Sequence, residues 1–276
     1  MDSKELMMNI LRCGLSCADE KSPCHSIWEA QGCREVRDFH LPEPWNGDVE
    51  NASALVVSIN PRITPGELFP RFGCDFWLDK AGKLDPNRAD DFFRNRFEGY
   101  FVTHEKGTCF KVRHEDGSMR NPGGHYWTQV HHAVQVLLNR LEIVPGRDYA
   151  LTEVVHCKTL RENAAAECCN YCAGKWFEQI LCLAKKAKAI LVLGNLARIY
   201  VSKKVGINAP QSYRRYQVSI GGTDRICVFA DHPASFGGGI DFQALGRAMT
   251  TEINPNITTG TLKIAVAKRH PRYPAL

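Results

Sequence analysis

Four short runs rich in β-branched and other apolar residues constrain the fold of this chain more than any other feature. Between them lie longer stretches in which apolar residues recur with the helical period. Apolar strands that alternate with helices are typical of a parallel sheet covered on both faces. We therefore expect an α/β protein with strands in "SALVVSIN" (53–60), "YALTEVVHC" (149–157), "KAILVLGN" (188–195) and "RICVFADHP" (225–233).

The expected helices and one hairpin complete this pattern. Helical periods occupy residues 125–141, 164–187, 196–204 and 241–253. The segment "RRYQVSIGGTDRICVFA" (214–230) predicts a β-hairpin because Gly221 and Gly222 suit the positive φ angles of a two-residue turn.

We expect one domain with an extension at each end. The chain has 276 residues, which is enough for one large α/β core. Residues 1–50 would form a cysteine-containing N-terminal arm, 51–255 the α/β domain, and 256–276 a basic C-terminal tail. Residues 62–124 are a long excursion rich in Gly, Pro and aromatic residues, and connections of this length are usually functional.

Composition limits the functional classes. The sequence contains no apolar run long enough for a transmembrane helix and no secretory signal, so we expect a cytoplasmic protein that binds no membrane. The 12 cysteines then point to a metal, a cluster or buried thiols rather than disulfides. A net charge of +5 permits nucleic-acid binding without requiring it.

Polar motifs follow the predicted strands at their carboxyl ends, where open parallel sheets bind ligands. "SINPR" after the first strand and "DHPAS" after the last resemble the two active-site motifs of the uracil-DNA glycosylase superfamily. "LTEVVHCKT", "CAGKWFEQIL" and "AKAILVLGN" are similar to the iron–sulfur branches of that superfamily. The resemblance covers roughly residues 33–255.

This resemblance implies both a fold and an activity. The fold is a three-layer α/β/α sandwich with a central four-stranded parallel sheet. The activity is that of a monofunctional DNA N-glycosylase, which flips a base out of the DNA stack and hydrolyses its bond to deoxyribose. We expect such an enzyme to act as a monomer on DNA.

Two residues carry the catalytic expectation. Asn60 would position the attacking water, and His232 would donate a hydrogen bond to O2 of the departing base as negative charge develops there. The alternatives are structural: an Asn that caps the turn before Pro61, and a histidine bonded to the backbone.

The resemblance also places residues on the DNA and on the base. Ser235, Phe236, Gly237 and Arg62 would contact DNA, with Phe236 as the wedge that fills the gap left by the flipped base. A flexible glycine-rich turn is the alternative. Phe76 would stack on the base beside Ile59, with Phe72 as its rival.

Four cysteines could hold a structural [4Fe–4S] cluster. Cys157 and Cys172 have nearly the spacing of one ligand pair in the iron–sulfur branches, and Cys17 and Cys24 from the arm would supply the other pair. The arm lacks the usual C-x-x-C spacing, so reduced buried cysteines remain the alternative.

Glu153 bears most on the choice of base. In the iron–sulfur branches an asparagine that binds the uracil edge occupies this register. An ionised glutamate only accepts hydrogen bonds, so it favours the amino group of a cytosine-like base over O4 of uracil. A protonated carboxyl group could still bind uracil, and a salt bridge to Arg161 would remove Glu153 from the base altogether.

Three functions follow from these observations. The favoured one is a glycosylase for a modified cytosine, such as a hypermodified phage base, because a cell cannot tolerate removal of its ordinary cytosine. The alternatives are a repair glycosylase for uracil or other deaminated bases, and a non-catalytic DNA-binding protein on the same fold.

Overall fold

A computed structural model provides the fold. It describes residues 2–63, 69–74, 77–79, 82–97, 102–104, 107–109, 111–120, 126–160, 162–235, 239–251 and 260–262. Within these residues, no helix combines the length and the apolar character needed to cross a membrane.

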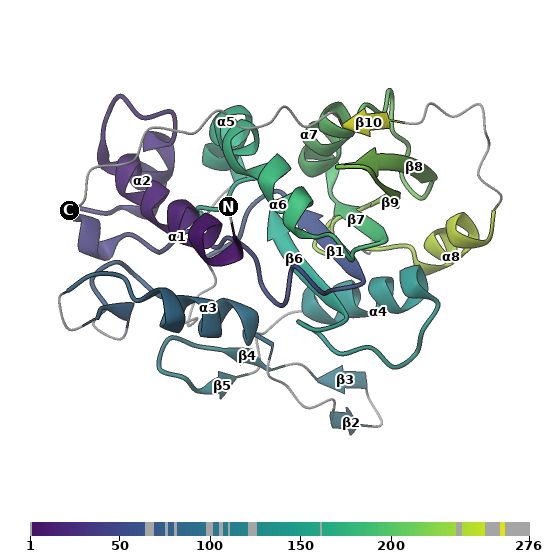
Figure 1. Ribbon diagram of the computed structural model, residues 1–276, viewed down its shortest axis with the longest axis horizontal. Coiled ribbons are helices and arrows are strands. Elements are labelled where there is room, and N and C mark those ends of the chain that lie inside the picture. Colours follow the sequence, from purple (N-terminus) through teal and green to yellow (C-terminus); the bar gives the residue numbers. More distant parts are fainter. Residues whose placement is uncertain are drawn as a thin grey trace.

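The four predicted strands form the parallel centre of one sheet, which confirms the α/β class. They are β1 (Ala54–Ser58), β6 (Tyr149–Glu153), β7 (Ala189–Leu193) and β9 (Thr223–Ala230). β1 pairs in parallel with β6 and with β7, and β7 pairs in parallel with β9. All four strands therefore end at the same edge of the sheet (Figure 1).

The sheet is wider than the four strands that we expected. Its order is β10-β8-β9-β7-β1-β6. β8 (Arg215–Ile220) pairs antiparallel with β9, as the predicted hairpin requires, and short β10 (Gly260–Leu262) pairs in parallel with β8. The expected count was wrong because the hairpin lies in the same sheet and extends the hydrogen-bonded ladder beyond β9.

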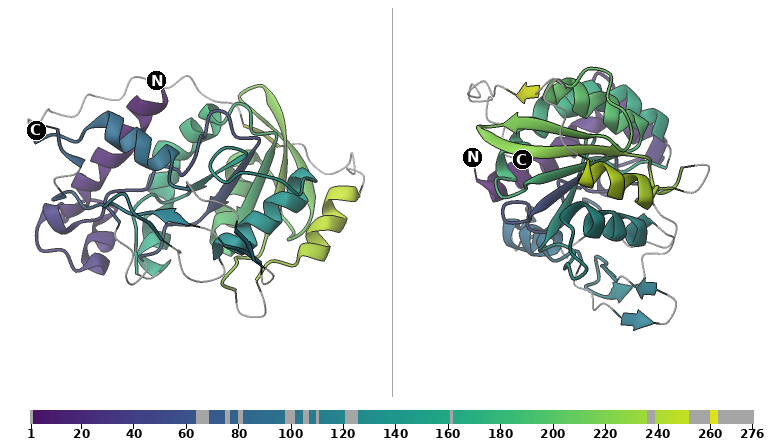
Figure 2. Two further views of the ribbon diagram at one scale, coloured as in Figure 1. Left: turned by 90° about the horizontal axis from the view of Figure 1, so that it is seen from below. Right: turned by 90° about the vertical axis from the view of Figure 1, so that its right-hand side faces the viewer.

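Two helical layers cover the sheet, one on each face (Figure 2). Ala54 and Val56 point toward the face packed by α4 (Tyr126–Leu138) and α8 (Phe242–Thr250). Leu55 and Val57 point to the opposite face, which packs against α5 (Glu162–Cys172), α6 (Glu178–Leu183) and α7 (Asn195–Val205). This alternation confirms the expected α/β/α layering.

The helix predicted over 164–187 is continuous but not uniform. A π-helical turn, Ala173–Phe177, joins α5 to α6 and contains the "AGKWF" part of the cysteine motif. Turns of this kind occur frequently at functional sites.

The N-terminal segment packs onto the α5–α6 side. It consists of α1 (Ser3–Cys13), the 3₁₀ turns Gly14–Ala18 and Val36–Asp38, and α2 (His25–Gln31). Apolar residues of α1, such as Leu6 and Ile10, belong to the same hydrophobic cluster as Leu55 of β1.

The long excursion holds α3 (Pro86–Arg94) and two small antiparallel pairs. The pairs are β2 (Val102–His104) with β3 (Gly107–Cys109), and β4 (Val112–Arg113) with β5 (Met119–Arg120). Both pairs lie beyond α3, away from the central sheet (Figure 1).

Candidate active site

A pocket of about 480 Å³ lies where the parallel strands end. It is formed by the segments that follow β1, β6, β7 and β9, so residues far apart in sequence meet there. Its lining residues are Ile59, Asn60, Arg62, Thr159, Leu160, Leu193, Gly194, Asn195, Leu196, Ala197, His232, Ala234 and Ser235. Five residues that the sequence analysis assigned to catalysis, base or DNA are among them: Ile59, Asn60, Arg62, His232 and Ser235.

The side chain of Asn60 is oriented by two hydrogen bonds. Its Nδ2 donates to Thr159 Oγ1 at 2.8 Å and to the Pro61 carbonyl at 3.1 Å. Because a carbonyl only accepts, the atom that faces Pro61 must be the amide nitrogen. No hydrogen bond to Oδ1 forms among the described residues, so Oδ1 can accept from a water molecule or a ligand.

The ring of His232 is held in one tautomer by its own loop. The Ala234 backbone N–H donates to Nδ1 at 3.2 Å, so Nδ1 carries no proton in this arrangement. A neutral imidazole then carries its proton on Nε2 and can donate it to a ligand. The Ser235 N–H donates to the His232 carbonyl at 2.8 Å, which closes the turn.

Tyr213 fixes both ends of the loop that carries His232. Its hydroxyl donates to Asp231 Oδ2 at 3.1 Å and accepts from the Asp241 N–H at 2.9 Å. Asp231 and Asp241 are thus linked through a tyrosine that the sequence did not single out.

The β7–α7 turn brings a helix N-terminus to the pocket. Gly194 has a φ of +87°, and an added Cβ would lie 3.3 Å from His232 Cβ. Glycine therefore permits both the turn and the close approach of His232. Asn195 and Leu196, the first residues of α7, line the pocket, and a helix N-terminus favours anions such as a DNA phosphate.

Glu153 lies behind this pocket rather than in its lining. It is 9% exposed, and it pairs across the ladder with Ser58 of β1. Ser58 Oγ and the Tyr126 hydroxyl are 2.7 Å apart, and the Tyr126 ring lies 5.5 Å from the His232 ring. Ser58 and Tyr126 therefore connect Glu153 to His232, and Tyr126 is an aromatic residue of the site that we did not predict.

The surroundings of Glu153 favour its neutral form. Burial raises its pKa well above the ordinary value, the Glu43 carboxylate raises it further, and Ser58 and Lys158 act in the opposite direction. Glu153 Oε2 has no hydrogen-bond partner among the described residues.

A buried ion pair lies beside Glu153, and the carboxylate of that pair helps to raise the pKa of Glu153. Lys158 Nζ lies 3.0 Å from Glu43 Oε2, and both side chains are almost completely buried. Burial alone would raise the pKa of Glu43, but the charges of Lys158 and Arg96 lower it below its ordinary value. The negative charge therefore stays on Glu43, and a second one on Glu153 is unfavourable.

Several predicted residues are not in the pocket or lie outside the described part of the chain. Phe72 stacks on Phe39, with ring centroids 6.3 Å apart, in the cluster under the N-terminal segment. It is therefore not a base-stacking residue of this pocket. Phe76, Phe236, Gly237 and Arg161 lie outside the described residues.

The cysteines proposed as cluster ligands gather beside the N-terminal segment. Cys17 Sγ and Cys157 Sγ are 3.9 Å apart, and Cys24 forms hydrogen bonds with Cys17 and Cys168. Cys172 accepts a hydrogen bond from the His156 backbone. Cys13 and Cys168 lie in the same group. The irregular spacing of the cysteines in the arm did not predict that these two residues would lie there.

The described thiols favour the protonated state in the absence of a cation. The hydrogen bond with Cys17 lowers the pKa of Cys157, but burial and the neighbouring thiols together raise it to about 11. Burial likewise raises the pKa of Cys172. No group of three or more His, Cys, Asp or Glu side chains in the described residues is arranged to hold a single metal ion.

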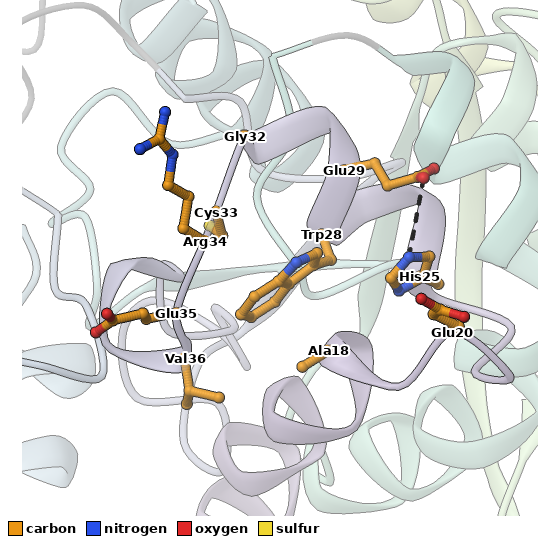
Figure 3. Close-up of a pocket in the computed structure, with 10 residues that line it drawn as sticks. All are labelled: Ala18, Glu20, His25, Trp28, Glu29, Gly32, Cys33, Arg34, Glu35 and Val36. Atoms are coloured by element: carbon orange, nitrogen blue, oxygen red, sulfur yellow. Dashed lines mark ion pairs between the residues drawn. The ribbon is translucent and has the colours of Figure 1, made fainter.

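A larger, more open hollow of about 790 Å³ lies on the N-terminal segment, away from the strand ends (Figure 3). Trp28 forms part of its wall, and His25 pairs with Glu29 at 3.8 Å. Glu20 and Glu35 add negative charge, which disfavours nucleic acid. The pocket at the strand ends is therefore the candidate active site.

Comparison with known protein families and with curated proteins finds no match for this chain.

Replacing Glu153 with Gln tests its neutral state. Because the pKa of Glu153 is raised in the folded protein, its contribution to stability is full at low pH and is lost as the pH rises through the folded pKa. As the pH rises above the ordinary pKa of a glutamate, 4.5, we expect the free energy of unfolding to decline less in Glu153→Gln than in the parent protein. Urea unfolding at a series of pH values measures this. The exposed Glu142→Gln variant is the control, and equal declines in parent and Glu153→Gln proteins would contradict the assignment.

Proposed function

We propose that this protein is a DNA glycosylase that hydrolyses the N-glycosidic bond of a flipped nucleotide. One observation carries the proposal: Asn60 and His232, which follow the two strands on either side of β7, line one pocket with complementary hydrogen-bonding roles. Asn60 offers an acceptor, Oδ1, and His232 offers a donor, Nε2–H.

These two roles match the needs of the reaction. Cleavage develops positive charge on the sugar and negative charge on the departing base. A water held by Asn60 Oδ1 would attack C1′ of the sugar as its bond to the base breaks, and the proton that this water loses would neutralise the departed base. The Nε2–H of His232 would stabilise the charge on O2 of the base without the need for a full proton transfer. Asparagine is a weak base, so stabilisation of the leaving group supplies most of the rate enhancement.

DNA would approach the pocket at the carboxyl edge of the sheet. The N-terminus of α7 and the exposed Arg62 side chain provide positive potential there, and Ser235 provides a hydrogen-bond donor for a phosphate. Tyr126, beside His232, is the described aromatic residue best placed to contact the face of a bound base.

Glu153 lies behind the pocket lining, so it would read the Watson–Crick edge of a base that is inserted past that lining. A neutral carboxyl group both donates and accepts, so it can donate to N3 and accept from the N4 amino group of a cytosine. With the two roles exchanged it can also bind O4 and N3–H of uracil. Charge repulsion therefore does not exclude uracil from a pocket with a neutral Glu153.

We favour an amino-bearing pyrimidine because any ionisation of Glu153 penalises uracil but retains the contact with an amino group. A cell cannot tolerate the removal of ordinary cytosine from its own DNA. A modified cytosine, such as a hypermodified base of phage DNA, has the amino group and is absent from the DNA of the cell. The protein would then act in antiviral defence. Repair of uracil is the second candidate, supported by the raised pKa of Glu153.

The proposal includes a structural [4Fe–4S] cluster held by Cys17, Cys24, Cys157 and Cys172. Its support is the convergence of these thiols with Cys13 and Cys168 in one buried region. Iron would shift the balance toward the thiolate forms that burial disfavours. The cluster would tie the N-terminal segment to β6 and α5.

Substitution of the two catalytic candidates tests the enzyme class. We expect Asn60→Ala and His232→Ala each to slow base release by about 10²–10³-fold, because each removes a group that acts at the reacting atoms. Single-turnover release from an oligonucleotide measures this, and fluorescence anisotropy measures DNA affinity. Asn51→Ala and His25→Ala, away from the pocket, are matched controls. DNA binding without base release in the parent protein would instead support the non-catalytic alternative.

A panel of oligonucleotides tests the choice of base. The panel contains uracil, hypoxanthine, 5-hydroxymethylcytosine and glucosylated 5-hydroxymethylcytosine, with cytosine as the control. We expect release of the modified cytosines and no release of cytosine. All of these bases carry an N4 amino group, but a cell can tolerate the removal only of those that are absent from its own DNA. Release of uracil alone would replace the favoured substrate with the repair substrate and leave the enzyme class intact.

Serine substitutions test the cluster and its ligands. We expect iron content and visible absorbance to be lost in Cys17→Ser, Cys24→Ser, Cys157→Ser and Cys172→Ser, because each removes a thiolate ligand. Cys13→Ser and Cys168→Ser should retain both signals and serve as controls within the same group. Loss of the signals in either control would reassign a ligand, and a colourless, iron-free parent protein would contradict the cluster.

A further inference from the structure

A third cavity, separate from the hollow on the N-terminal segment, lies at the opposite edge of the sheet from the candidate active site. It has a volume of about 740 Å³ and is lined by residues at the amino ends of β1, β7 and β9. Ser53 precedes β1, Lys188 precedes β7, and Thr223 begins β9. The strands separate this cavity from the pocket that holds Asn60 and His232.

The lining of this cavity is strongly cationic. Lys185, Lys186 and Lys188 are exposed around it and Arg225 is buried in it, whereas Asp224 is the one carboxylate among its described lining residues. Lys186 Nζ donates to Asn51 Oδ1 at 2.8 Å, which holds one ammonium group at the rim. Cations concentrated in a concave surface attract anions more strongly than the same charges on a convex one.

Arg225 distinguishes this cavity from an ordinary group of surface lysines. Its side chain is only 3% exposed, yet no hydrogen-bond acceptor for Nε or Nη1 lies among the described residues. On β9 it lies on the same face as Cys227 and Phe229, so its aliphatic part lies on the α6 side of the sheet. Buried guanidinium groups are normally paired with a carboxylate or a phosphate, because an isolated buried charge is unfavourable.

The depth of Arg225 restricts the ligand that can reach it. A phosphodiester in a DNA backbone is flanked by sugars on both sides and stays on the surface. A terminal phosphate can enter a cavity and bind an arginine in its wall, with the rim lysines neutralising its remaining charge.

We propose that the cavity bounded by Lys186, Lys188 and Arg225 is a binding site for a small ligand with a terminal phosphate or pyrophosphate group. Ligand at this site does not block the pocket at the strand ends, so the protein can hold it and DNA together. The proposal is independent of the glycosylase activity.

Isothermal titration calorimetry of the full chain with inorganic phosphate and with pyrophosphate tests the site. We expect saturable binding at low salt, stronger for pyrophosphate because it carries more charge. Lys188→Ala should weaken binding about tenfold, because it removes one charge-assisted contact. Lys203→Ala removes the same charge from an exposed position on α7 and should leave the affinity unchanged.

Arg225→Met provides a second readout. In the parent protein, pyrophosphate should raise the melting temperature, and Arg225→Met should abolish this rise. Without ligand, the melting temperature of Arg225→Met should equal or exceed that of the parent protein, because the substitution removes an unpaired buried charge.

Three outcomes would overturn the proposal. They are absence of binding by both probes, equal weakening in Lys188→Ala and Lys203→Ala, and displacement of pyrophosphate by an oligonucleotide without terminal phosphates. The last would indicate a nucleic-acid surface instead.

Discussion

The parallel pairing of β1 with β6 and β7 is the constraint on which the rest of the structure depends. It places the ends of four strands along one edge and so brings Asn60 and His232 into the same pocket. The same register sets Ser58 opposite Glu153. A shift of one residue would turn Glu153 to the opposite face of the sheet, away from Ser58 and Tyr126.

A small group of buried ionisable residues decides the chemistry behind that pocket. The pair of Glu43 and Lys158 balances its own charge, whereas Glu153 forms no ion pair with any residue that the structure describes. Such an arrangement contributes little net stability, because the loss of hydration opposes the attraction between charges. Its value lies in leaving one carboxyl group neutral, able to donate as well as to accept a hydrogen bond.

The two edges of the sheet carry different kinds of positive potential. At the carboxyl edge it comes from a helix N-terminus and Arg62 around a pocket with polar, directional groups. At the amino edge it comes from lysines around the buried Arg225. The first arrangement suits an extended strand of nucleic acid, and the second suits a compact anion.

The sequence by itself determined the α/β class, the four parallel strands, the Gly221–Gly222 hairpin and the motifs at the strand ends. These features depend on local propensity and on apolar periodicity, which a single sequence displays. The sequence also predicted that Asn60 and His232 lie in one pocket, because parallel strands end at a common edge of the sheet.

Only the tertiary structure decided the remaining features. It added β8 and β10 to the sheet, placed Phe72 away from the pocket and brought Tyr126 beside His232. It also placed Glu153 near the Glu43–Lys158 pair, where burial and the Glu43 carboxylate raise its pKa and so favour the protonated form, one of the two forms that the sequence left open. Pairing partners, distances and pKa shifts arise from contacts between residues distant in sequence, and no local pattern encodes them.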